Sequence, residues 1–161
     1  MLSALAIHVL SFLGIIAGFI VAHYSYDELK DGSQYFRVLR NIFIILIILA
    51  LTLTIKFQYY HILLFIAGIL FGYFFRFTSL YLGLAGVIGI LSGNLALIPS
   101  LIFLYGLPEG TLQYYHHKSE TLKRHTLFKL LLFVLPLVLL AAPNLTVLAS
   151  FAMGALIMQL T

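Results

Sequence analysis

The chain has 161 residues, of which 63% are hydrophobic and only 9% are charged, and its mean hydropathy is +1.12. A soluble domain does not carry this composition, so we expect an integral membrane protein. The net charge of +4 comes from basic residues spread over short polar segments, which excludes a nucleic-acid-binding stripe. The absence of cysteine excludes disulfides and thiolate-held metals.

The apolar blocks of the N-terminal half are longer than strands and do not alternate in polarity, so they predict membrane-spanning helices. The first span is expected at residues 2–24 and is followed by a polar loop over residues 26–40, in which Gly32 can close a helix. A second span at 41–55, an interfacial turn at 56–60 and a third span at 61–75 complete a helical hairpin that ends at Arg76.

The apolar stretch over residues 79–106 can be read as one long helix or as a hairpin of two short arms. With one helix, the basic residues divide almost evenly between the two sides of the membrane. With two arms that turn near residues 92–94, every Lys and Arg except Lys56 lies on one side, as the positive-inside rule favours. The charge distribution therefore predicts a short or re-entrant hairpin.

The C-terminal half repeats the order of the first half. A polar loop is expected over residues 107–128, followed by helices at 129–140 and 145–160 that turn at 141–144, with a kink at Pro136. The fold class is thus an all-α polytopic transmembrane bundle of six to seven spans, forming a single membrane domain over residues 1–161. Its parts are a three-helix unit at 2–76, the hairpin at 79–106 and a second three-helix unit at 95–160 that overlaps the hairpin. The order of loops leaves open a parallel repeat of the type found in some small transporters.

All acidic residues fall in the two expected polar loops, so the sequence places no carboxylate inside the membrane, which argues against an ion-coupled carrier. Polar or helix-breaking residues within the apolar segments are the candidates for a solute path: Asn94, Gly93, Ser92, Pro99 and His8. The alternative interpretation of the glycine-rich segments is close helix packing, since Gly68 and Gly72, like Gly89 and Gly93, have the spacing of closely approaching helices.

The same two loops hold imidazoles and carboxylates that could serve a metal or acid–base chemistry. The candidates for catalysis are Glu109, His116, His117, Glu120 and Asp27. The candidates for metal binding are His23, Asp27, Asp31, His116, His117 and His125. No compact ligand motif is present, and a solvated surface explains the clustering equally well, so no cofactor is predicted and a divalent metal is left open.

Three functions remain open on the sequence alone. The first is a small multi-pass transporter or channel component for a small solute or ion. The second is a membrane-surface enzyme acting on a lipid headgroup or peptide, and the third is a non-catalytic subunit of a larger complex. We expect the N-terminus outside the cytoplasm, the C-terminus inside it, and the bilayer as the main partner, with a homo-oligomer or membrane partner bound through small-residue helix faces.

Overall fold

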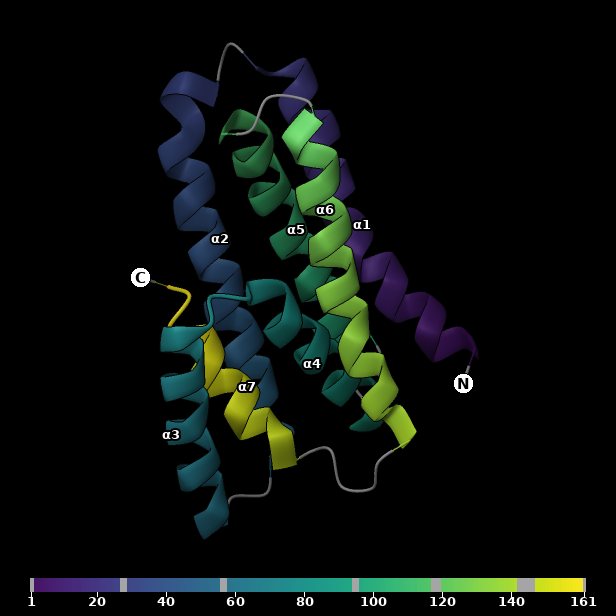
Figure 1. Cartoon of the computed structure of the whole chain (residues 1–161), viewed down its shortest axis with the longest axis vertical. Helices are drawn as coiled ribbons and strands as arrows, with labels where there is room; N and C mark the ends of the chain where they lie inside the picture. The colour runs from purple at the N-terminus through teal and green to yellow at the C-terminus, as the bar shows by residue number, and fades with distance from the viewer. Residues whose placement is uncertain are drawn as a thin grey trace.

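The computed structural model describes residues 2–26, 29–55, 58–93, 96–116, 120–141 and 147–160, and this part of the chain is helical without strands. Figure 1 shows most of the helices running roughly along the long axis of the molecule, with the N-terminal part of α1 slanting away from it. In chain order they are α1 Leu2–Tyr24, α2 Leu29–Thr52, α3 Tyr59–Phe74, α4 Thr78–Leu91, α5 Leu97–His116, α6 Glu120–Val134, the 3₁₀ segment η1 Leu135–Ala141, and α7 Leu148–Ile157.

Two of these helices contain segments long and apolar enough to cross a membrane, Ala6–Tyr24 and Gly32–Thr52. The other apolar helices α3, α4 and α7 have 16, 14 and 10 residues, so each is shorter than the roughly 30 Å hydrocarbon core. The all-helical class is therefore confirmed, whereas the expected bundle of six to seven spans is not. The length and the apolar composition of these segments of α1 and α2 support a membrane location.

The expectation of two long polar loops is wrong. Helix α2 already begins at Leu29 and runs through Gly32, Arg37 and Arg40, and α5 continues from the apolar hairpin as far as His116. Polar side chains such as Arg, Lys and Gln are good helix formers, so the end of an apolar run does not end a helix. The described parts of the polar segments are instead helical extensions of α2, α5 and α6, which reach the upper end of the molecule in Figure 1.

The 79–106 stretch is interrupted, as the charge distribution predicts. Helix α4 ends at Leu91 and α5 begins at Leu97, so a single helix over this stretch is excluded. Gly93 adopts φ +81° in the turn, a left-handed conformation that costs glycine least because it has no Cβ. Asn94 lies outside the described residues.

Glycines join two parallel helix pairs. The peptide carbonyl of Phe103 lies against Gly14, and the backbone of Ile15 lies against Gly106 and Gly110, so α1 and α5 approach along their backbones. In the same way, Gly68 and Gly72 on α3 face Phe151 and Ala155 on α7. These spacings serve packing within the chain, where a larger residue would push the helices apart.

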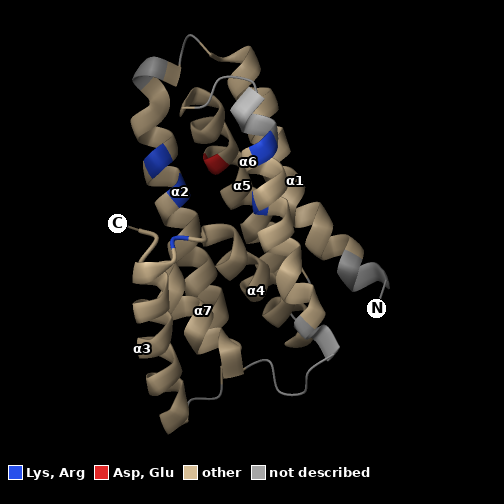
Figure 2. Cartoon of the chain, viewed as in Figure 1, with Lys and Arg blue, Asp and Glu red and all other residues tan. Residues whose placement is uncertain are grey.

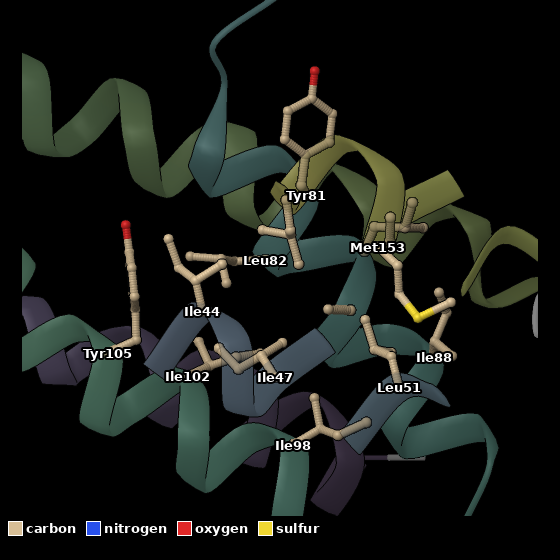
Figure 3. Close-up of a cluster of buried hydrophobic side chains, with 14 of the residues drawn as sticks. Ile44, Ile47, Leu51, Tyr81, Leu82, Ile88, Ile98, Ile102, Tyr105 and Met153 are labelled. Atoms are coloured by element: carbon tan, nitrogen blue, oxygen red, sulfur yellow. The ribbon is translucent and has the colours of Figure 1, made fainter. Parts of the chain in front are cut away.

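The core lies between α2, α4, α5 and α7. Figure 3 shows that Ile47 and Leu51 of α2 lie near Ile98 and Ile102 of α5. Tyr81 of α4 is fully buried, and its hydroxyl donates a hydrogen bond of 2.6 Å to the Phe75 carbonyl. Burial of these side chains fixes the position of α5, and α5 carries most of the polar residues described next.

Candidate functional site

A carboxylate from the middle of α5 lies between two cations from other helices. Glu109 Oε1 accepts a hydrogen bond of 3.0 Å from Lys129 Nζ on α6, and Glu109 Oε2 lies 3.8 Å from Arg40 Nη1 on α2. Figure 2 shows this acidic position on α5 flanked by basic positions on α2 and α6. The Glu109 side chain is only 14% exposed, against 26% for Arg40 and 30% for Lys129. We call Arg40, Glu109, Lys129 and the adjoining Gln113 the ion cluster.

Neighbouring residues orient the members of the cluster. Asn41 Oδ1 accepts hydrogen bonds from Arg40 Nε at 3.2 Å and from Nη2 at 3.1 Å, which fixes the plane of the guanidinium group. Gln113, one helical turn after Glu109, donates from Nε2 to Glu109 Oε1 at 2.8 Å. The other amide atom, Gln113 Oε1, is buried without a hydrogen-bond partner. These hydrogen bonds orient the cluster but leave one acceptor, Gln113 Oε1, unsatisfied.

Helix α5 is weakened directly beside Glu109. Pro108 lies inside the helix and has no N–H to donate to the carbonyl one turn earlier. Thr111 Oγ1 lies 2.9 Å from the Leu107 carbonyl oxygen and 3.1 Å from that of Gly18 on α1, so its hydroxyl can bond either. The segment that carries Glu109 is thus bonded partly through side chains, which makes it a point at which α5 can bend.

The burial of Glu109 corrects the expectation that this residue lies in a polar loop. The sequence places Glu109 in a loop because polar residues surround it, but α5 remains helical there and packs on α1. Its partners Arg40 and Lys129 are distant in sequence, and an ion pair between either of them and Glu109 was not predicted. Gln113 was also missed, although its spacing of four residues from Glu109 on one helix could have indicated the contact.

His8 is fully buried, and one of its two ring nitrogens has a structural partner, whereas Nδ1 has no hydrogen-bond partner. Its Nε2 lies 3.2 Å from the Phe133 carbonyl oxygen, and its ring stacks on Phe133. Pro136 lies three residues after Phe133, where α6 changes to η1. Because proline has no N–H, a carbonyl of the preceding turn lacks its usual hydrogen-bond donor. His8 supplies that donor, while Gly83 and Gly86 on α4 leave space for Phe133 and His8. The interpretation of His8 as part of a solute path therefore has a simpler alternative.

The turn between α4 and α5 lies at the surface rather than inside the bundle. Gly93 is exposed, with no atom within 4 Å of the position where a Cβ would stand. Ser92 Oγ bonds the Gly89 carbonyl at 3.0 Å. Pro99 is buried and lines an open, mostly apolar groove of about 440 Å³ together with Ser11 and Ser100. The described part of the turn is therefore not enclosed, contrary to expectation.

The histidines proposed as metal ligands do not converge in the described part of the chain. His23 Nδ1 lies 2.9 Å from the Tyr114 hydroxyl, so α1 does approach the polar end of α5. His116 lies seven residues beyond Glu109 on α5, a rise of about 10.5 Å, and His125 is exposed on α6. No group of three metal-ligating side chains occurs among the described residues. Asp27 and His117 lie outside these residues, and the side chains of Asp31 and Glu120 are likewise not described.

A second polar pair lies toward the other end of the bundle, where His61 of α3 meets Ser150 of α7. His61 Nδ1 and Ser150 Oγ are 2.7 Å apart, and both residues line an open groove of about 390 Å³ with apolar walls. The sequence did not single out Ser150. The bond connects the first turns of two parallel helices, which is a helix-packing role.

No protein family, curated protein or solved structure matches this chain.

Proposed function

We propose that this chain is a small membrane transporter or channel component for a small solute or ion, and that the ion cluster is a charged point on its path. The observation that carries the proposal is the Glu109 carboxylate, held between Arg40 and Lys129 from two other helices. Ionisable groups are costly in a membrane protein interior, and those that occur there commonly serve the passage of a solute or ion.

The apolar exterior supports a membrane setting for this cluster. Many large hydrophobic side chains are exposed on α1, α2 and α3, among them Leu10, Ile20, Leu49, Leu63 and Leu70. Such an abundance of exposed apolar side chains is typical of helices in contact with lipid or with partner chains. A polar cluster inside such an exterior is the reverse of the arrangement in a soluble protein.

The packing of the two halves also supports the proposal. Helix α1 lies parallel to α5, and α3 lies parallel to α7, so the first and third helices of one unit pair with their counterparts in the other. Two copies of one orientation would produce this arrangement, and transporters built from such repeats place their solute sites between the copies. Pro108 adds a discontinuity next to Glu109, a feature shared by many transporter helices.

The other two functions draw less support from the described residues. A carboxylate bound to Lys129 and Gln113 is poorly suited to act as a general base, which weakens the case for an enzyme that uses Glu109. The small-residue faces considered for partner binding are occupied within the chain, since Gly14 and Gly106 pack together, as do Gly72 and Ala155. A role as a partner-binding subunit would need a different surface.

Flux into proteoliposomes tests the proposal. Stopped-flow light scattering would follow gradients of glycerol, potassium chloride and potassium lactate, with valinomycin present for the salts. We expect flux above protein-free liposomes for at least one probe, reduced by Arg40→Gln and Lys129→Gln. The exposed cations Arg37 and Arg124, on the same two helices, provide the matched controls Arg37→Gln and Arg124→Gln. Flux equal to that of empty liposomes for every probe, or unaffected by the cluster variants, would overturn the proposal.

A further inference from the structure

The ion cluster carries an excess of positive charge. It contains two cations and one carboxylate, and Glu109 is the one acidic side chain that the structure describes. All three side chains are at least two-thirds shielded from solvent. Partly buried charge is unfavourable unless it is paired, so the cluster has a residual preference for a second anionic group.

The hydrogen-bond donors of the two cations are only partly used. Arg40 Nη1 lies 3.8 Å from Glu109 Oε2, too far for a hydrogen bond, because Asn41 holds the other side of the guanidinium group. Lys129 makes one hydrogen bond within the cluster, to Glu109 Oε1, although an ammonium group has three N–H donors. Glu109 also receives hydrogen bonds from Gln113 and from the Tyr105 hydroxyl, so the two cations keep N–H donors that the carboxylate does not use.

The unpartnered atom of Gln113 gives an independent indication of a ligand. The Gln113 residue is 8% exposed, and its Oε1 has no hydrogen-bond donor although its Nε2 touches Glu109. Native proteins rarely leave such an acceptor unsatisfied. A ligand that satisfies it must bring a hydrogen-bond donor close to its own anionic group.

We propose that a small carboxylate whose adjacent carbon bears a hydroxyl or amino group binds between Arg40 and Lys129 in place of the Glu109 side chain. The inference rests on the proposed function and assigns its solute class. The ligand carboxylate takes the two cations, and its neighbouring donor reaches Gln113 Oε1. Glu109 then acts as a tethered competitor that neutralises the site when the ligand is absent, and the discontinuity at Pro108 lets its segment move aside.

Equilibrium binding to the full chain in nanodiscs tests the assignment, with radiolabelled lactate and alanine as probes and acetate as the carboxylate that lacks the donor. We expect lactate, alanine or both to bind roughly tenfold or more tightly than acetate, the loss typical of an unpaired buried polar group. Tight binding of lactate alone would identify a hydroxyl group as the donor, and tight binding of alanine alone would identify an amino group. Gln113→Leu should remove this preference while keeping acetate binding.

Charge variants provide the second arm. Arg40→Gln and Lys129→Gln should weaken binding roughly 10- to 100-fold, as expected for loss of a hydrogen bond between charged groups, whereas Arg37→Gln should leave it unchanged. Glu109→Gln should tighten binding because it removes the competing charge. Each variant is compared by its thermal unfolding in nanodiscs, so that a misfolded protein is recognised.

Absence of saturable binding at millimolar concentration of all three probes, or equal affinity for acetate and lactate together with weak alanine binding, would overturn the assignment. Glycerol or chloride flux that depends on Arg40 would then leave the transporter proposal standing. Conversely, specific binding without any flux would refute transport and retain the site.

Discussion

The contact between α1 and α5 makes a quantitative prediction about one added methyl group. In Gly110→Ala the new Cβ would stand 2.2 Å from the Ile15 carbonyl oxygen, whereas ordinary contacts begin near 3.4 Å. Both partners are backbone, so relief requires the helices to separate by about 1 Å along a seam that also contains Gly14 and Gly106. Overpacking of this kind costs about 1–3 kcal/mol of unfolding free energy.

Gly32→Ala is the matched control. Gly32 lies inside α2, and the nearest atom to its added Cβ would be Phe36 Cε2 at 3.8 Å, an ordinary van der Waals contact. Alanine is a better helix former than glycine, so the free energy of unfolding of this variant should rise by about 0.5–1 kcal/mol. The two substitutions are chemically identical but are expected to change the free energy of unfolding in opposite directions.

The measurement is unfolding by SDS titration of the purified protein in mild detergent, followed by far-ultraviolet circular dichroism. Gly110→Ala should shift the midpoint to lower SDS and Gly32→Ala to higher SDS. If Gly110→Ala is as stable as the parent protein, the close backbone approach of α1 and α5 is wrong. The placement of Glu109 relative to α1 would then need revision, because Glu109 precedes Gly110 directly.

Three further outcomes are expected. His8→Leu should lower the unfolding free energy by about 1–3 kcal/mol in the same titration, because the buried Phe133 carbonyl loses its donor, and an unchanged midpoint would show that another group replaces it. Gly93→Ala should lower the free energy of unfolding by about 1–2 kcal/mol although the surroundings of Gly93 are open, since its φ is +81°. Gly93→Asn should lower it less, and equal stability of the parent protein and both variants would contradict the left-handed turn. Because the chain has no cysteine, Ser33→Cys and Ser92→Cys report on topology: a membrane-impermeant maleimide should label them from opposite sides, and labelling from one side would refute an odd number of membrane crossings between them.

The amino-acid sequence was sufficient to predict the all-helical class and the position of several helices. The helix expected at residues 2–24 matches α1, and the break between residues 92 and 96 follows from a glycine-rich segment and from the distribution of Lys and Arg. Pro136 was expected to disturb its helix, and α6 changes to η1 at Leu135. These features depend on composition and local backbone preference, which act over a few residues.

The helix ends in polar segments were not predictable in the same way. The change from apolar to polar residues near Arg40 and Glu109 marks a change of surroundings, not of backbone conformation. Helices α2 and α5 therefore continue beyond their apolar runs, and Gly32 lies within a helix instead of ending one. The packing of Gly106 and Gly110 on α1 stabilises this part of α5, and that contact is invisible in the local sequence.

The composition of the ion cluster was decided only by tertiary structure. Sequence alone grouped Glu109 with His116, His117 and Glu120 of its own polar segment and with Asp27 of the first polar segment. In the folded protein Glu109 instead meets Arg40 and Lys129 from α2 and α6. A partly buried carboxylate selects its partners by charge and by hydrogen-bond geometry, and both depend on which helices pack together rather than on which residues are neighbours in sequence.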